Sequence, residues 1–157
     1  MMEKELDRSQ AKEKALRLLS FRSHSEKELS DKLKRAGAKA KDLPYILEFV
    51  REYGFVDDEK YALHLAKDLQ NIKKYAKNRI VQELKKRGIA EEHIETALSE
   101  LSEDESDALF PLIERKLGGS FDQKSIDRAI RYFVYRGYDF GDIKRCIEKI
   151  RENQEEE

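Results

Sequence analysis

The chain repeats itself at intervals of 47 and 46 residues, and this repeat limits its possible folds more than any other feature. Each copy opens with the same two residues: Ala15-Leu16, Ala62-Leu63 and Ala108-Leu109. A period of this length is typical of helical repeat proteins, in which each copy is one small group of helices. Runs that alternate apolar and polar residues, as strands do, are scarce, so the repeat unit is expected to be helical.

A glycine follows the second helix of each copy, at Gly37, Gly88 and Gly137. Apolar residues stand four and eight positions before each glycine, which places them on one helix face a turn apart. The glycine itself is expected to adopt the left-handed conformation just past a helix end. A third apolar stripe begins six residues after the glycine in the later two copies and nine after it in the first. The unit is therefore helix, helix, glycine, helix, with a three-residue insertion near residues 38–41.

These patterns predict an all-α fold of three tandem three-helix repeats, forming an elongated, curved array. The expected repeats are residues 1–54, 55–102 and 103–157. The expected helices cover about 8–22, 26–36, 42–53, 57–71, 76–87, 91–101, 104–117, 123–136 and 140–152. Charged residues make up 41% of the chain and hydrophobic residues 39%, which suits helices that each bury a single stripe. A single irregular bundle is the alternative.

Two acidic or hydroxyl caps mark helix starts. Ser25 with Glu28 three residues later has the spacing of a capping box. Asp57 is the expected cap of the fourth helix, with Asp58 in its first turn, where negative charge is favourable. The adjacent carboxylates also resemble an acid–base pair, but their position favours capping. Pro111 falls inside the seventh helix and predicts a kink or a later start.

No pattern in the sequence points to catalysis, so we expect neither an enzyme nor a cofactor or metal site. His24, His64 and His93 have no partners at metal-ligand spacing, and each is expected to be a surface or partly packed histidine. Cys146 lies on an apolar stripe and is expected to pack as a small hydrophobe. A lone cysteine, with no signal-like or membrane-spanning apolar run, predicts a soluble cytoplasmic protein with no membrane partner.

Charge is strongly segregated in the middle of the chain, although the net charge is only −1. Between Lys67 and Arg87 there are eight basic and two acidic residues, whereas between Glu91 and Asp107 there are eight acidic and no basic ones. A basic segment containing an aromatic residue can follow a phosphate backbone, while the acidic segment can meet a basic patch on a protein partner. A solvated helix face explains the basic run equally well. The candidate binding residues here are Lys73, Lys74, Tyr75, Lys77, Arg79, Lys85, Lys86 and Arg87.

The eighth helix carries a second candidate surface. If Ala129 and Phe133 face the core, helical geometry turns Arg131 and Tyr135 to the opposite side and places Arg128 beside the buried stripe. Arginine and tyrosine are frequent anchors of interfaces. An ordinary solvated face again remains the alternative.

Three segments resemble the RecX family, the bacterial regulators of the RecA recombinase: Ala15–Leu33, Tyr53–Ala62 and Arg79–Ile89. They include the Ser25–Glu28 start, the step from glycine and an aromatic residue to Asp57-Asp58, and the helix that ends at Gly88. The third copy is similar to the family more loosely, through Gly137 and its apolar spacing. The resemblance implies tandem three-helix repeats and a protein that binds the RecA–DNA filament and restrains recombination, DNA repair and SOS co-protease activity.

The leading hypothesis is therefore a regulator that binds the RecA recombinase filament. A free-standing helical module that binds single- or double-stranded DNA is the alternative, supported by the basic run of the middle copy. A helical scaffold for another protein partner is a third interpretation.

Overall fold

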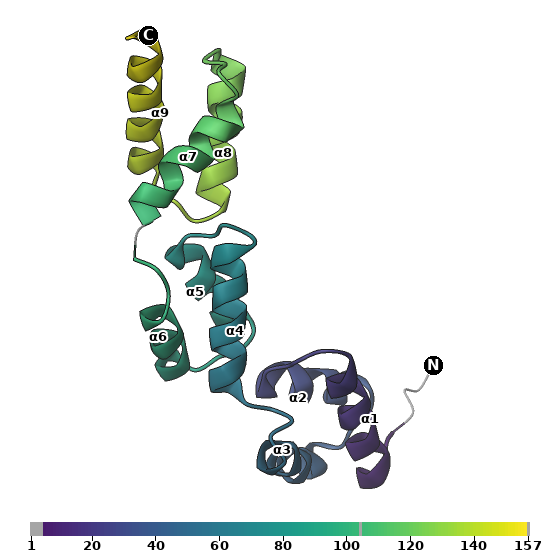
Figure 1. Ribbon diagram of the computed structural model, residues 1–157. Helices are drawn as coiled ribbons and strands as arrows, with labels where there is room; N and C mark the ends of the chain where they lie inside the picture. The colour runs from purple at the N-terminus through teal and green to yellow at the C-terminus, as the bar shows by residue number, and fades with distance from the viewer. Residues whose placement is uncertain (1–4, 104, 157) are drawn as a thin grey trace. The chain divides into compact units, whose positions relative to one another are not determined.

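The computed structural model describes residues 5–103 and 105–156, and within this part the chain is helical with short connections (Figure 1). Its only β feature there is an isolated bridge between Leu6 and Ala38. The elements are α1 (Arg8–Phe21), α2 (Glu26–Arg35), the 3₁₀ turn η1 (Ala40–Asp42), α3 (Leu43–Glu52), α4 (Asp58–Asn71), α5 (Lys77–Lys86), α6 (Glu91–Ser99), α7 (Glu105–Leu117), α8 (Gln123–Tyr135) and α9 (Phe140–Glu155). The predicted all-α class is confirmed.

Most predicted helix limits agree with the structure to within two residues. The largest difference is at the end of α9, which continues to Glu155 rather than stopping near 152. The helix α7 runs through Pro111, so the proline causes no late start, while its predicted first residue, 104, lies outside the described residues. The insertion expected near residues 38–41 coincides with η1. Gly37, Gly88 and Gly137, which follow the second helix of each copy and are called the stop glycines below, have φ values of 104°, 78° and 96°. These values are the left-handed conformation that such helix ends require.

The caps also agree with prediction. The Ser25 hydroxyl accepts a 3.1 Å hydrogen bond from the Glu28 N–H, and the Glu28 carboxylate accepts one from the Ser25 N–H. Asp57 accepts a bond from the Lys60 N–H at the start of α4. Asp58 accepts one from the Glu26 N–H, and burial raises the pKa of its carboxyl. Both aspartates therefore hold helix starts.

The chain forms two compact units, and the division falls inside α4 and α5. One unit holds the residues up to Ala66 together with Glu83–Ser99, and the other holds Lys67–Gln82 together with the residues from Glu100 on. Because these units do not follow the repeat, the repeat limits at 54 and 102 remain a prediction.

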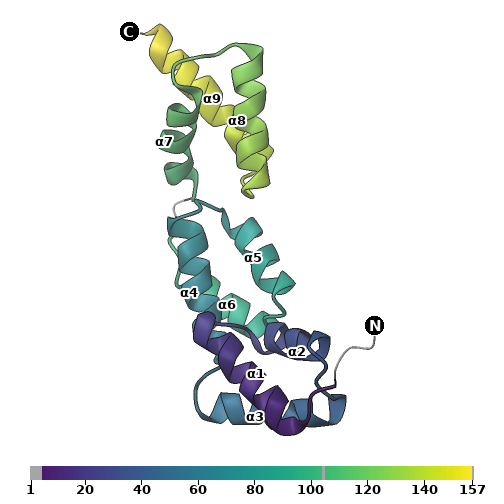
Figure 2. The same ribbon diagram turned by 90° about the vertical axis from the view of Figure 1, so that its right-hand side faces the viewer.

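The first unit contains a core formed where α1, α2 and α3 contact one another. In Figure 2 the three helices are seen around this shared interior. Its buried residues are Ala11, Ala15, Leu29, Leu33, Leu43, Ile46, Val50 and Val56. Burial of this set removes the apolar stripes from water, which is the main contribution to stability in a small helical unit.

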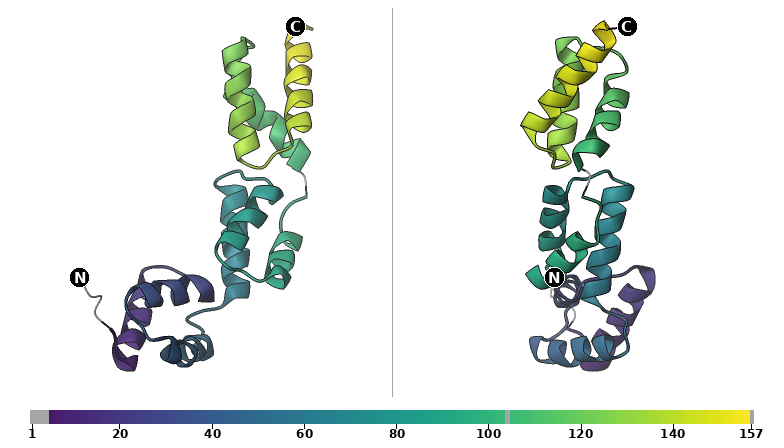
Figure 3. Two further views of the ribbon diagram at one scale, coloured as in Figure 1. Left: turned by 180° about the vertical axis from the view of Figure 1, so that it is seen from behind. Right: turned by 60° about the vertical axis from the view of Figure 1, so that its left-hand side comes forward.

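The second unit contains a three-helix bundle, in which α8 and α9 lie side by side and α7 packs against both (Figure 3). Its buried residues are Leu109, Ile113, Leu117, Ala129, Phe133, Ile143, Ile147 and Ile150. In the third copy, the two residues that open the repeat differ in burial from those of the first two copies. Ala15 and Ala62 are buried, but here Leu109 is buried and Ala108 is exposed. The third copy is therefore shifted by one residue relative to the sequence repeat.

Candidate nucleic-acid interface

One face of α8 presents a row of three cations and a tyrosine. Lys124, Arg128, Arg131 and Tyr135 follow one another at intervals of four, three and four residues, and all four are exposed. At 100° per residue these positions form a single stripe about 16 Å long. The residues of α8 that enter the core lie on the opposite side. The predicted outward position of Arg131 and Tyr135 is confirmed, and the four residues are called the α8 strip below.

The start of α5 adjoins the end of the α8 strip. The Arg79 guanidinium lies over the ring of Tyr135, 4.3 Å from its centroid, and also over the ring of Tyr75, at 5.1 Å. It donates hydrogen bonds to the Tyr135 carbonyl at 3.0 Å and to the Tyr135 hydroxyl at 3.3 Å. The structure thus brings together two predicted candidates of the middle copy and one of the third.

The turn before α5 and the first residue of this helix hold three more candidates, Lys73, Lys74 and Lys77. Lys73 and Lys74 are exposed, and Lys74 has a left-handed φ of 59°. The carbonyl of Lys74 accepts a 3.1 Å hydrogen bond from the Tyr138 hydroxyl, and the Lys77 N–H donates to the Glu105 carboxylate. These bonds fix the backbone of the turn, while the ammonium groups of Lys73 and Lys74 remain on the surface.

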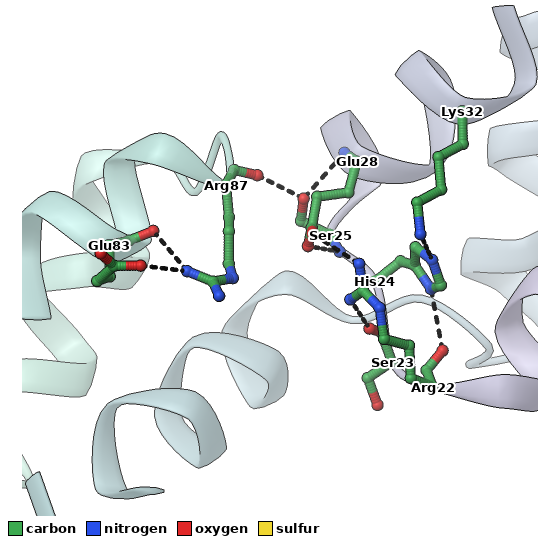
Figure 4. Close-up of polar contacts among 8 residues, drawn as sticks. All are labelled: Arg22, Ser23, His24, Ser25, Glu28, Lys32, Glu83 and Arg87. Atoms are coloured by element: carbon green, nitrogen blue, oxygen red, sulfur yellow. Dashed lines mark hydrogen bonds and ion pairs between the residues drawn. The ribbon is translucent and has the colours of Figure 1, made fainter. Parts of the chain in front are cut away.

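The remaining candidates are at the other end of α5 and belong to the first unit. Lys85 and Lys86 are exposed in the last turn of the helix, where cations favour the helix dipole. Arg87 is half-buried, and its guanidinium donates to the Glu83 carboxylate at 2.9 Å (Figure 4). Its carbonyl accepts a hydrogen bond from the Ser25 hydroxyl at 2.5 Å. Arg87 therefore has structural partners, and the basic run of the middle copy is divided between the two units.

His24 lies beside this contact and is buried, although it was expected on the surface or partly packed. Its Nδ1 is 2.9 Å from the Arg22 carbonyl and its Nε2 is 2.8 Å from the Lys32 ammonium nitrogen (Figure 4). Since an ammonium group only donates, Nε2 accepts and Nδ1–H donates, which fixes a neutral tautomer. Burial lowers the pKa of His24, and the charges of Arg22 and Lys32 lower it further.

Two aspartates, Asp122 and Asp127, are close to the cations of the α8 strip in the sequence. Hydrogen bonds from Ser125 and Ser120 lower the pKa of the Asp122 carboxyl at the start of the helix, and Arg128 adds to this effect. The exposed Asp127 accepts a 2.8 Å bond from the Gln123 amide. No carboxylate in the described residues forms an ion pair with Lys124, Arg128 or Arg131. The strip can therefore attract an anion without first breaking a salt bridge.

One residue of the strip was missed in the sequence. Lys124 was not a candidate, although its spacing from Arg128 places it in the same stripe. Arg136, which follows α8, lies outside the strip: its guanidinium is 3.5 Å from the centroid of the Tyr132 ring, and the Lys116 ammonium nitrogen is 4.1 Å from the same centroid. Arg136 therefore belongs to the packing of the bundle.

The described residues include no cluster of three or more His, Cys, Asp or Glu side chains that could hold a metal ion. Cys146 packs against the core of the second unit, as predicted, and burial raises the pKa of its thiol. Within the same part of the chain, none of the helices is long and apolar enough to cross a bilayer.

Comparison with known proteins gives the family. The model of the first three-helix domain of RecX matches residues 11–41, and that of the second matches residues 57–98. The regulatory protein RecX of Vibrio campbellii is 34% identical over 140 residues, which cover 87% of this chain and 89% of that protein. The chain belongs to the RecX family. RecX of Clostridium perfringens is 30% identical over 149 residues, which cover 91% of this chain and 69% of that one.

Two solved RecX structures have the same fold. The crystal structure of RecX from Lactobacillus salivarius aligns with a TM-score of 0.73 at 19% identity, covering 90% of this chain and 95% of the other. A second RecX crystal structure aligns with a TM-score of 0.75 at 20% identity, covering 94% and 82%. This RecX-family chain is therefore similar to its relatives in helical architecture as well as in sequence.

Proposed function

We propose that this chain regulates the RecA recombinase, mainly as an inhibitor. It binds the RecA–DNA filament and thereby restrains recombination, DNA repair and SOS co-protease activity. The observation that carries the proposal is its membership of a family of regulatory proteins, through a match that extends over 87% of the chain. A binding rather than a catalytic role also agrees with the surface features described above.

A repeated helical chain suits a repeated polymer as its partner. Each copy of the unit presents its own surface, so one molecule has several separate sites from which to contact successive subunits. Several modest contacts on one molecule combine into a much stronger attachment, provided that they engage together. Such attachment blocks access to the filament or weakens its subunit interfaces, and either effect lowers recombinase activity.

The acidic and basic surfaces suit different parts of a protein–DNA filament. The first turns of α6 expose Glu91, Glu92 and Glu95, with His93 3.8 Å from Glu92, and these carboxylates favour a basic patch on a protein subunit. The α8 strip has the opposite charge and favours an anion.

The direct test is a titration of this protein against the recombinase, with ATP hydrolysis and DNA strand exchange as readouts. We expect both activities to fall as the protein approaches the concentration of filament subunits. A triple variant, Glu91→Gln, Glu92→Gln and Glu95→Gln, tests whether the acidic face takes part, because it should inhibit less at the same concentration. If the wild-type protein at a several-fold excess leaves both activities unchanged, the proposed function is wrong.

The second candidate function is a DNA-binding module that acts without the recombinase. The unpaired cations of the α8 strip are the observation that favours it. Binding of DNA alone, falling steeply with added salt, together with no effect on the recombinase, would support this alternative.

A further inference from the structure

The exposed face of α8 differs in charge from that of its neighbour α9. The exposed charged residues of α9 include both signs in similar number, as on an ordinary solvated helix. By contrast, the α8 strip has three cations in a row, and Arg79 adds a fourth charge at its end through the contact with Tyr135. The carboxylate beside the strip, that of Asp127, already accepts a hydrogen bond from Gln123. Lys124, Arg128 and Arg131 thus form a row of one sign that has no ion-pair partner among the described residues, and such a row is matched by a ligand with regularly spaced negative charge.

The shape of the row narrows the choice of ligand. Lys124, Arg128 and Arg131 are spread along the helix axis with rises of about 6 and 4.5 Å between them, which suits a line of phosphates better than one compact anion. An acidic protein surface requires a face of matching shape, whereas the backbone of a nucleic acid offers its charge along a flexible line.

Apolar side chains at the end of the strip favour an unpaired strand over a duplex. Tyr135 is 59% exposed and the adjacent Val134 is 46% exposed. Bases of single-stranded DNA stack on such side chains, while the bases of a duplex are already stacked inside the helix. Tyr75 extends this aromatic end through Arg79.

From this geometry we propose that the α8 strip binds the phosphate backbone of single-stranded DNA, with Tyr135 and Val134 contacting an unpaired base. This proposal rests on the proposed function in one respect, because it identifies the surface by which the chain contacts DNA at the filament. It does not include Lys85, Lys86 or Arg87, which were grouped with the candidates by their sequence alone.

The test compares two variants of equal charge in the full-length protein. The strip variant carries Lys124→Gln, Arg128→Gln and Arg131→Gln. The matched control carries Lys34→Gln, Lys85→Gln and Lys86→Gln, three exposed lysines of the first unit. Arg79 is left unchanged because it contacts Tyr135, so that replacing it would also disturb the contact between α5 and α8. Circular dichroism and urea unfolding establish that both variants are folded.

Fluorescence anisotropy with a labelled 30-nucleotide oligo-dT measures binding over a range of salt concentrations. We expect the strip variant to bind about tenfold or more weakly at low salt, and its salt slope to fall by about 2, since each phosphate contact on a single strand contributes about 0.7. The control is expected to bind within about twofold of the wild type. Equal losses in the two variants, or no loss in the strip variant, would overturn the proposal.

Two further measurements separate its parts. A duplex of the same length tests the choice of an unpaired strand, because Tyr135→Ser should weaken binding of oligo-dT and leave the duplex unaffected. Tighter binding of the duplex overturns that choice. Recombinase inhibition separates this proposal from the proposed function. If the strip variant inhibits as well as the wild type, the strip is not the surface that contacts DNA at the filament, and the regulatory function still stands. If the wild-type protein binds oligo-dT without inhibiting the recombinase, the regulatory function is refuted.

Discussion

The hydroxyl of Ser25 donates a 2.5 Å hydrogen bond to the backbone carbonyl of Arg87, which is 62 residues further along the chain. Ser25 caps the start of α2, and Arg87 follows the end of α5. The second unit has a corresponding contact, in which the Ala76 N–H donates to the Arg136 carbonyl at 2.9 Å. Ser25 and Ala76 each stand twelve residues before the stop glycine of their copy. In each unit, the start of the second helix of one copy thus meets the end of the second helix of the next copy.

Replacing Ser25 with alanine should lower the free energy of unfolding by about 2 kcal/mol. The change removes the cap of the Glu28 N–H, a loss of about 1 kcal/mol, and leaves the Arg87 carbonyl without its donor. Urea unfolding followed by circular dichroism measures the effect. Ser99→Ala is the control, since that exposed hydroxyl donates only to a carbonyl of its own helix and its loss should matter little. A loss of only about 1 kcal/mol would show that the Arg87 contact contributes nothing, and equal losses in the two variants would contradict both effects.

The second prediction concerns Gly137, where a side chain would collide with α5. A Cβ atom there would lie 2.8 Å from the Arg79 backbone nitrogen and 2.7 Å from the Arg79 Cβ. At Gly118, which also has a positive φ of 58°, no atom lies within 4 Å of such a Cβ. We expect Gly118→Ala to cost about 1 kcal/mol from backbone conformation alone, and Gly137→Ala to cost at least twice as much. Thermal or urea unfolding of the pair measures the difference, which should vanish if the close approach is unimportant.

The helices and their ends could be predicted from the sequence because their causes are local. A capping residue, an apolar stripe and a left-handed glycine act within a few residues of one another, as at Ser25 and Gly37. Register could also have identified Lys124, since its spacing from Arg128 is a property of a single helix. The pairing of Arg87 with Glu83, four residues earlier, is local in the same sense.

The arrangement of the candidate site could not be predicted in this way. Arg79 and Tyr135 are 56 residues apart, and helix periodicity carries no information about which helices meet. The basic run from Lys67 to Arg87 therefore looked like one surface, although its two ends belong to different compact units. Burial of His24 was missed for a related reason, because it depends on the packing of elements distant in the sequence.

His24 predicts that the protein loses stability in mild acid. Burial lowers its pKa in the folded state below the value of 6.5 for the free side chain, so the unfolded chain binds the proton more readily. The stabilising effect of neutral His24 is therefore complete above pH 6.5 and is lost as the pH falls through the lower folded-state pKa. Once protonated, Nε2 of His24 could no longer accept the hydrogen bond from the Lys32 ammonium group. The charged ring would also be a third positive charge beside Lys32 and Arg22.

The measurement is urea unfolding from pH 7.5 to 5.5 for the wild type, His24→Gln and His64→Gln. The wild type and the exposed His64 variant should lose stability in parallel, while His24→Gln should change less. Glu28 faces the same cluster, but hydrogen bonds from Ser25, Tyr61 and Arg22 outweigh its burial and lower its pKa, so that it titrates below this range. Identical pH dependence in all three proteins would contradict the assignment to His24.

Cys146 should react slowly with thiol reagents in the native protein. Burial against the core of the second unit raises the pKa of its thiol, and only the thiolate is nucleophilic. At pH 7.5 the modification rate with a disulfide reagent should therefore be several-fold below that of free cysteine, and it should rise to the free value in denaturing urea. Cys146→Ala provides the blank, because the chain has one cysteine. A native rate equal to that of free cysteine would mean that the thiol is fully exposed, and so that α9 does not pack as described.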